Sequence, residues 1–285
     1  MSTSKARGVL IPIGGNEDKG ADESYTLDYI NGGILSHVVN ESGGPDARIV
    51  VIPTASSIPD KVAENYLDAF KKLECTNVKI LDIRTREDSE TLASLNAIEE
   101  AKCVMFSGGN QSKITKIIGQ TKMHDLLIQK HKDEKFVIAG TSAGAMAMST
   151  SMIAGGSSVE SLLKGAVKLS TGLGFISDLV IDSHFIRRGR FGRLAEAMAS
   201  LPNLIGVGLA EDTGLVIQKG KFKVIGSGMV IVFDPSHLTH NSHEILHTGT
   251  PMSMSNLIVH VLANGDQFKM KKRKIEILPL EEAFV

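Results

Sequence analysis

A serine stands between two glycines just after an apolar run, in the sequence Gly140-Thr-Ser142-Ala-Gly144. The pattern G-x-S-x-G is typical of a sharp strand-to-helix turn, and the apolar residues 136–139 supply the strand. Such a turn strains the serine backbone and tolerates only near-absent side chains on both sides. The hydroxyl then lies near the positive end of a helix, where the amide of Ala143 can donate to an oxyanion. We therefore predict that Ser142 is a nucleophile; the alternative is a serine that only caps the helix.

Nine histidines could supply a base for this serine, and His184 has the best position among them. It follows the apolar run Leu179–Ile181, which places it at the carboxyl end of a predicted strand, on the same edge as Ser142. Glu211 directly follows another apolar run, so it reaches that edge too. An acid there can orient the imidazole and complete a triad. Asp212 could instead cap or support the turn, and a solvated turn is the alternative for the pair.

The segments that must position these side chains alternate strictly in the first half of the chain. Short apolar runs, typical of strands that are covered on both faces, are separated by helix-length segments with apolar residues at helical spacing. This alternation predicts right-handed crossovers and a three-layer α/β fold, with a mostly parallel sheet and helices on both faces. The expected strands are Gly8–Ile13, Arg48–Ile52, Val78–Leu81, Cys103–Phe106 and Phe136–Ala139, and the expected helices are Pro59–Leu73, Asp88–Glu100 and one or two within Gln111–Lys130.

The second half of the chain remains α/β, with antiparallel strands expected around two glycines. No linker, internal repeat or low-complexity segment interrupts it, so we expect one domain that spans residues 1–285. The expected strands are Leu179–Ile181, Ile205–Leu209, Leu215–Gln218, Lys221–Ile225, Met229–Phe233 and a basic edge strand at Lys269–Ile277, and the expected helices are Arg187–Ser200 and Pro251–Leu262.

Composition limits the class of protein. A chain of 285 residues with 42% hydrophobic content can bury a substantial core. Its 31 Lys and Arg against 32 Asp and Glu give a net charge of -1, which excludes a globally basic nucleic-acid binder. The two cysteines, Cys75 and Cys103, exclude a disulfide scaffold or a cysteine-built zinc site and favour a reducing compartment. No apolar stretch approaches the roughly 18 residues of a membrane span or the length of a signal segment. We expect a soluble cytoplasmic protein with no membrane or nucleic-acid partner.

Four arginines lie within seven residues shortly after His184. Arginine binds carboxylates through a planar fork that is always charged. Gln111 and Asp182 could bind a cationic or amide group beside them. Such a site suits a small zwitterion with carboxylate and guanidinium groups, such as a β-linked Asp-Arg unit. The alternative is a basic helix that pairs with surface acids or binds phosphate. The four arginines are Arg187, Arg188, Arg190 and Arg193.

Six sequence blocks, in the same order, resemble the cyanophycinase and aspartyl dipeptidase group of serine peptidases. The resemblance covers roughly residues 8–270. The threonine before Ser142 is more similar to cyanophycinases than to the dipeptidases, which tend to carry tryptophan there. The blocks are IPIGGNEDK (residues 11–19), VIPTAS (51–56), FSGGNQ (106–111), GTSAGA (140–145), DSHFIRRGRFGRL (182–194) and GVGLAEDTGLV (206–216).

The resemblance implies a fold akin to class I glutamine amidotransferases, a flavodoxin-like architecture, with serine where those enzymes have cysteine. It implies a serine exopeptidase that releases β-Asp-Arg dipeptides from cyanophycin-type peptides, and a homodimer. Ser183 stands where cyanophycinases usually carry a glutamine that is associated with the substrate pocket. An isoaspartyl or aspartyl dipeptidase acting on small acidic peptides therefore stays open.

The resemblance also assigns roles to residues. Independently of it, we expect no metal and no other cofactor. The triad falls on Ser142, His184 and Glu211, and the oxyanion hole on Gly109, Asn110 and Ala143. The expected substrate contacts are Gln111, Asp182, Ser183, Arg188, Arg190 and Arg193.

Three other interpretations compete with this one. An α/β-hydrolase esterase shares G-x-S-x-G, but its base follows its acid and would be His237, His240 or His243. A non-catalytic protein on a flavodoxin-like scaffold could hold a phosphate in its glycine turns. The run from His237 to His247 could bind a metal, but it lacks HExxH and fits no common zinc spacing, so a solvated loop is favoured.

Overall fold

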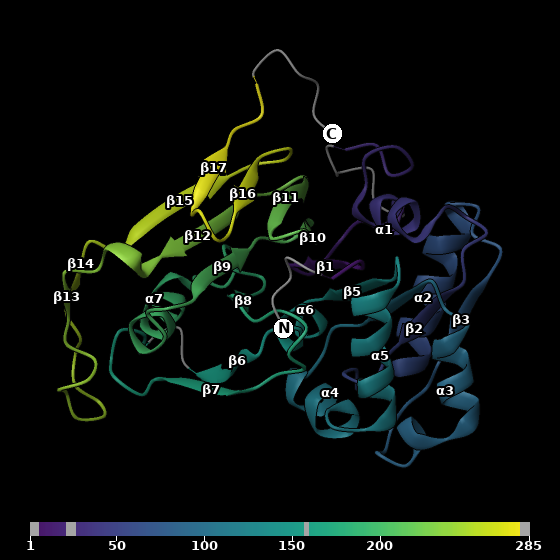
Figure 1. The fold of residues 1–285 in the computed structure, drawn as a ribbon, viewed down its shortest axis with the longest axis horizontal. Coiled ribbons are helices and arrows are strands. Elements are labelled where there is room, and N and C mark those ends of the chain that lie inside the picture. The colour runs from purple at the N-terminus through teal and green to yellow at the C-terminus, as the bar shows by residue number, and fades with distance from the viewer. Residues whose placement is uncertain (1–5, 21–26, 157–159, 280–285) are drawn as a thin grey trace.

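The computed structural model describes residues 6–20, 27–156 and 160–279 (Figure 1). Its largest sheet has nine strands in the order β17-β16-β11-β10-β1-β5-β4-β2-β3. The adjacent strands β1, β5, β4, β2 and β3 pair in parallel. Strands β10, β11, β16 and β17 pair antiparallel with their neighbours. The strands are β1 (Val9–Ile13), β2 (Ile49–Ile52), β3 (Val78–Ile80), β4 (Cys103–Phe106), β5 (Val137–Thr141), β10 (Thr213–Gln218), β11 (Lys221–Gly226), β16 (Gln267–Lys269) and β17 (Lys274–Glu276).

The sheet is therefore mixed, and the prediction of a mostly parallel sheet is wrong. The five strands expected in the first half do form a parallel group. The hairpin of β10 and β11, however, adds to the free edge of β1, and the hairpin of β16 and β17 adds to β11. Hydrophobic runs predicted the parallel strands and also β10 and β11, but they carry no information about which sheet a later hairpin joins.

Helices cover both faces of this sheet. Because side chains alternate along a strand, Val9, Ile11 and Ile13 of β1 enter one apolar cluster and Leu10 enters the other. Helices α1 (Ile34–Ser42) and α2 (Pro59–Lys72) pack on the first face, which we call the α2 face. The opposite face, the α4 face, holds α3 (Leu92–Glu99), α4 (Gln111–Ile118), α5 (Lys122–Asp133) and α6 (Ala143–Ala147).

A second sheet of four strands, in the order β15-β12-β9-β8, shares the core of the α4 face. Its members are β8 (Leu179–Asp182), β9 (Ile205–Leu209), β12 (Val230–Asp234) and β15 (Ile258–Leu262), and α7 (Phe191–Ser200) packs against β9. Strands β8 and β9 are parallel, so their carboxyl ends lie at the same edge. Because β8 packs against α6, this edge adjoins the turn that follows β5.

Several predicted elements differ from the observed ones. The helix expected at Pro251–Leu262 is wrong: this segment forms β14 (Met254–Ser255) and β15 instead. The β-branched residues of β15 suit a strand, and they pair with β12. The segment Asp88–Glu100 contains a short 3₁₀ helix and then α3, which Thr91 caps by accepting a hydrogen bond from the amide of Ser94. Helix α7 begins at Phe191, four residues later than expected.

Other elements had no clear sequence signal. Helix α1 and the hairpin of β6 (Ser151–Gly156) and β7 (Val167–Thr171) were not expected. In the described ranges no helix combines the length and the apolar character that crossing a bilayer requires.

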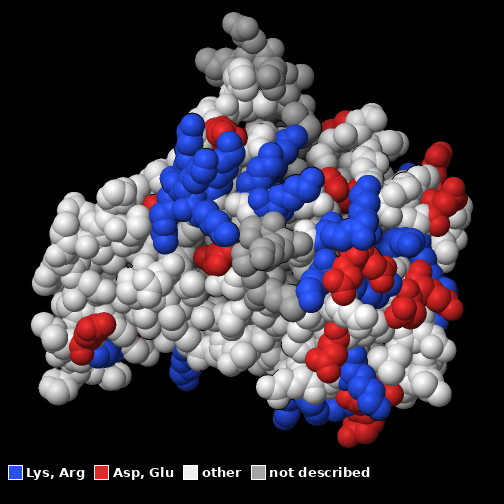
Figure 2. All heavy atoms as spheres, viewed as in Figure 1, with Lys and Arg blue, Asp and Glu red and all other residues white. Residues whose placement is uncertain are grey.

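The expected basic edge strand at Lys269–Ile277 is found in part. It consists of β16, a turn and β17, and β17 is the outermost strand of the large sheet. Lys and Arg side chains gather over β11, β16 and β17 on the face seen in Figure 2. Charged side chains on an edge strand discourage pairing with the sheet of another molecule. The exposed lysines here are Lys221, Lys271, Lys272 and Lys274.

Candidate active site

Ser142 occupies the turn between β5 and α6. Its backbone has φ 51° and ψ −108°, a conformation that residues with a Cβ rarely adopt. The flanking glycines permit it: a Cβ on Gly140 would lie 2.7 Å from the carbonyl carbon of Gly144, and a Cβ on Gly144 would lie 2.5 Å from the carbonyl oxygen of Phe106. The turn thus has the crowded, strained geometry that the G-x-S-x-G pattern predicts.

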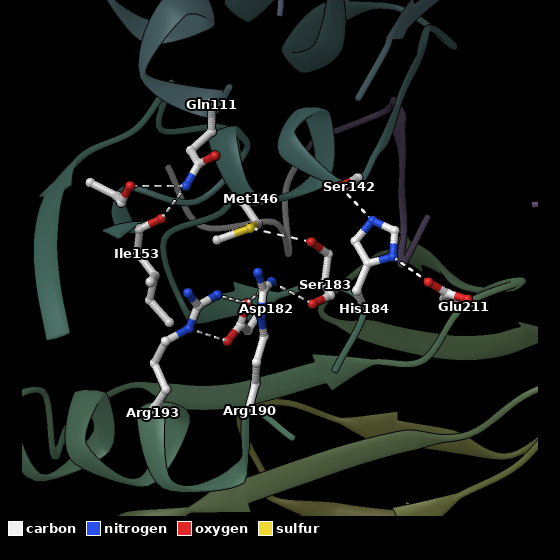
Figure 3. Close-up of polar contacts among 11 residues, drawn as sticks. Gln111, Ser142, Met146, Ile153, Asp182, Ser183, His184, Arg190, Arg193 and Glu211 are labelled. Atoms are coloured by element: carbon white, nitrogen blue, oxygen red, sulfur yellow. Dashed lines mark hydrogen bonds and ion pairs between the residues drawn. The ribbon is translucent and has the colours of Figure 1, made fainter. Parts of the chain in front are cut away.

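His184 and Glu211 lie beside this serine and form a continuous row with it (Figure 3). The Oγ atom of Ser142 is 2.9 Å from Nε2 of His184. On the other side of the ring, Nδ1 is 2.6 Å from Oε1 of Glu211. His184 follows β8 and Glu211 follows β9, two parallel strands whose carboxyl ends lie together, and the packing of β8 against α6 brings them to Ser142. The three side chains are 42 and 27 residues apart along the chain.

The charges in this row are set by its surroundings. Burial would raise the pKa of Glu211, but hydrogen bonds from His184, Arg187 and Asn16 lower it to about 2, so the carboxylate is ionised. Its second oxygen accepts a hydrogen bond from Nη1 of Arg187 at 2.9 Å. Burial, with the nearby charges of Arg188 and Arg190, lowers the pKa of His184 despite the opposing effect of Glu211. The imidazole is therefore neutral at neutral pH: Nδ1 donates to Glu211, and Nε2 can accept a proton from the serine.

The loop after β1 holds the histidine from the other side. The carbonyl of Gly14 accepts a hydrogen bond from the amide of His184 at 2.8 Å. Gly15 has φ 103°, and a Cβ there would lie 2.4 Å from the imidazole ring, so only glycine fits. Asp212 anchors this loop, since it accepts from the amide of Asp18 at 3.0 Å and donates its own amide to the carbonyl of Gly15. Of the two acids after β9, Glu211 therefore contacts the imidazole and Asp212 supports the loop.

A cavity of about 400 Å³ opens beside Ser142 on the α2 face. This volume is typical of pockets that bind small molecules. Sequence analysis singled out Ser142, His184, Gly109 and Arg188 in its wall, but it gave no role to the loop after β1 or to α2. The signals for the former were the glycine turn of residues 14–17 at the end of a predicted strand and the block IPIGGNEDK. The cavity is lined by Gly15, Asn16, Glu17, Lys19, Val62, Asn65, Tyr66, Gly108, Gly109, Thr141, Ser142, His184 and Arg188.

Five of the six expected substrate contacts do not line this cavity. Asp182 is fully buried and forms ion pairs with Arg190, at 2.9 Å, and with Arg193 (Figure 3). Gln111 donates its amide to two carbonyls of β6, at 2.9 and 3.2 Å. The Ser183 hydroxyl points to Sδ of Met146, 3.3 Å away. Asp182, Arg190 and Arg193 thus form a buried ionic network, because a buried charge needs a partner of opposite sign.

The glycine turn after β4 lies next to the nucleophile turn. A Cβ on Gly108 would lie 3.4 Å from Cβ of Ser142, and Gly109 has φ 141°. The amide of Asn110 donates to the carbonyl of Ala55 at 3.0 Å, so it is not directed at the cavity. The side chain of Asn110 accepts from the amide of Ser112 and caps α4. Of the three expected oxyanion donors, Gly109 and Ala143 keep positions beside Ser142, whereas the amide of Asn110 is engaged.

The histidine run lies away from this site. His240 belongs to β13 (His240–Asn241), which pairs with β14 at the left edge of the molecule in Figure 1, whereas α6 lies near its centre. Its Nε2 atom is 2.8 Å from the hydroxyl of Ser253. Within the described residues, no group of three His, Cys, Asp or Glu side chains could hold a metal ion. An α/β-hydrolase would require a histidine that follows the acid in the chain. The imidazole that contacts Ser142 is instead His184, which precedes Glu211.

The chain is similar to known peptidases in both sequence and fold. A model of peptidase family S51 matches residues 28–225. The cyanophycinase of Trichormus variabilis is 34% identical over 277 residues, 96% of this chain and 90% of the relative. That of Geminocystis herdmanii is 33% identical, covering 93% and 94%. A solved peptidase from an acI-B1 actinobacterium has a similar fold, with a TM-score of 0.59 and 19% identity over 91% of this chain and 98% of that one. The chain therefore belongs to peptidase family S51 and is a cyanophycinase-like serine-type peptidase.

Proposed function

We propose that this peptidase acts on cyanophycin-type peptides and releases β-Asp-Arg dipeptides, with Ser142, His184 and Glu211 as its catalytic triad. The observation that carries the proposal is the unbroken row of hydrogen bonds, at 2.9 and 2.6 Å, that ends on a strained serine. The relatives named cyanophycinase support the substrate class.

The geometry supports a two-step acyl transfer. The Ser142 hydroxyl attacks an amide carbonyl while Nε2 of His184 takes its proton and later gives it to the leaving amine. Glu211 stays ionised, fixes the tautomer of the imidazole and stabilises its cation. The amides of Gly109 and Ala143 are the donors proposed for the oxyanion, and Asn110 holds the turn of Gly109 through its bond to Ala55. Water then hydrolyses the acyl-enzyme with His184 again as the base.

A substrate panel tests the proposed activity. The protein is incubated with insoluble cyanophycin and with free β-Asp-Arg, β-Asp-Lys and β-Asp-Leu, and the products are identified by mass spectrometry. We expect β-Asp-Arg to be released from the polymer and the free dipeptides to persist. Cleavage of the dipeptides without attack on the polymer would favour an isoaspartyl dipeptidase instead. No peptide product from any substrate would contradict the proposal.

The fall of kcat/KM at acidic pH should report the protonation of His184. Because burial and nearby arginines lower the pKa of His184 from its usual 6.5, kcat/KM should hold at pH 6.5 and fall only at lower pH, where the base becomes protonated. Arg188→Gln removes one of these charges, so the midpoint should move to higher pH, whereas Arg188→Lys should leave it near that of the unmodified protein. The measurement uses a neutral ester, which avoids effects on the binding of carboxylates. A midpoint above 6.5 in the unmodified protein would be inconsistent with a neutral His184 base.

A further inference from the structure

We propose that Lys19 is a preset anchor for a carboxylate of the substrate, and that the loop after β1 thereby selects acidic peptides. This inference rests on the proposed function only in taking the cavity beside Ser142 as the place where a peptide binds. Lys19 lines the cavity on the α2 face of the sheet, whereas the buried ion pairs of Asp182 lie on the α4 face.

Glu17 holds the Lys19 ammonium in position. Its side chain lines the cavity but is almost completely buried, and it accepts three hydrogen bonds. The donors are the Tyr66 hydroxyl at 2.6 Å, the Thr141 hydroxyl at 2.6 Å and the Lys19 ammonium at 2.9 Å. Burial alone would raise the pKa of Glu17, but Lys19 and the two hydroxyls lower it, so the group is ionised. Its oxygens are occupied, and Glu17 therefore orients its neighbours and does not bind a cationic substrate.

Lys19 is the group that Glu17 orients. Its Nζ atom also donates to the backbone carbonyl of Glu17 at 3.3 Å and lies 5.1 Å from the centre of the Tyr66 ring. The carbonyl of Lys19 in turn accepts from Nζ of Lys72 at 3.4 Å, which fixes the loop. The Lys19 side chain is nevertheless 28% exposed, and an ammonium has a third N–H to donate. A lysine held in place before binding loses less conformational entropy when it meets a ligand.

The charges around the cavity indicate which chemical group the third N–H of Lys19 binds. Lys19 and Arg188 bring two cations to the wall, whereas Glu17 brings one buried anion. The exposed Arg188 follows β8 and Lys19 follows β1, so the cations reach the cavity from two different strand ends. An electropositive wall next to the nucleophile favours a substrate with a carboxylate near the scissile bond. Thr141, the residue before Ser142, donates its hydroxyl to Glu17, so the anchor and the nucleophile keep a fixed spacing.

Kinetics on matched substrates test the anchor. The variants are Lys19→Met, Lys19→Arg and, as control, Lys61→Met, which removes an exposed lysine of α2 that does not line the cavity. The substrates are an acidic β-aspartyl peptide and the same peptide with its carboxylates amidated. For the acid, Lys19→Met should raise KM about 10- to 100-fold, as expected for a lost hydrogen bond to a charged group. For the amide, KM should change less than about 2-fold, and Lys19→Arg should restore most of the preference. An equal change for both substrates, or none, would overturn the proposal.

A binding experiment separates this inference from the proposed function. In protein carrying Ser142→Ala, calorimetry measures the affinity for β-Asp-Leu and for its amidated form, with and without Lys19→Met, after circular dichroism has verified folding. Carboxylate-dependent binding that requires Lys19 supports the anchor even if the unmodified protein hydrolyses nothing in the panel, in which case only the proposed function fails. Binding that ignores Lys19, or no binding of either form, would refute the anchor even if hydrolysis is observed.

Discussion

Replacing Ser142 by alanine is expected to lower kcat for peptide hydrolysis by about 10⁴- to 10⁶-fold, the range seen when other triads lose their nucleophile. The row from Ser142 to His184 and Glu211 has no other hydroxyl at its end, so nothing replaces the lost oxygen in the contacts of the described residues. Initial rates of dipeptide release from cyanophycin measure the effect. Folding should be preserved, because alanine keeps the small size that the turn requires.

The matched control is Ser112→Ala. Ser112 is exposed at the start of α4, near the glycine turn, and its side chain does not line the cavity. Its removal should leave kcat within about 2-fold of the unmodified protein, as for surface substitutions in general. Near-full activity of Ser142→Ala would show that another group is the nucleophile, and equal losses in both variants would indicate a general effect on folding.

The largest effect on stability is expected at Asp182. Its fully buried carboxylate pairs with Arg190 and with Arg193, of which Arg193 is itself 5% exposed. Asp182→Ala leaves two guanidinium groups without their partner, and breaking a buried ion pair in this way costs about 3–5 kcal/mol. The free energy of unfolding, measured by urea denaturation, should fall by that amount.

Asp68→Ala provides the comparison for this variant. Asp68 is exposed on α2, and its loss should change stability by no more than about 0.5 kcal/mol. If Asp182→Ala instead keeps its stability and only raises KM, Asp182 belongs to an open substrate pocket, as the family resemblance suggested. The two outcomes therefore decide between a structural and a substrate-binding role for the arginine-rich segment.

Local patterns predicted the parts of the site that depend on strand ends. The runs before Ser142, His184 and Glu211 are short, apolar and bounded by small or polar residues, so the residues that follow each strand could be identified without knowledge of the whole fold. The parallel pairing of β8 and β9 brings His184 and Glu211 to one edge, and the packing of β8 against α6 brings that edge to Ser142. This explains why three residues that are remote in the chain could be predicted as neighbours.

Features that depend on long-range packing could not be predicted in this way. The arginines at 190 and 193 match a carboxylate clamp in sequence, but only the fold shows that Asp182 already occupies them. Sequence analysis gave Glu17 and Lys19 no role, since Tyr66 and Thr141, which complete the cluster, lie 49 and 124 residues from Glu17. For the same reason β15 was mistaken for a helix, because its partner strand β12 determines its conformation.

Covalent trapping of the nucleophile tests the central claim most directly. The protein is incubated with a fluorophosphonate, digested and mapped by mass spectrometry, alongside His184→Ala and Glu211→Gln. The account predicts a single phosphonyl adduct on Ser142, formed much more slowly in both variants because the serine has lost its base or the orientation of that base. An adduct on another residue, or labelling of Ser142 at an unchanged rate without His184, would contradict it.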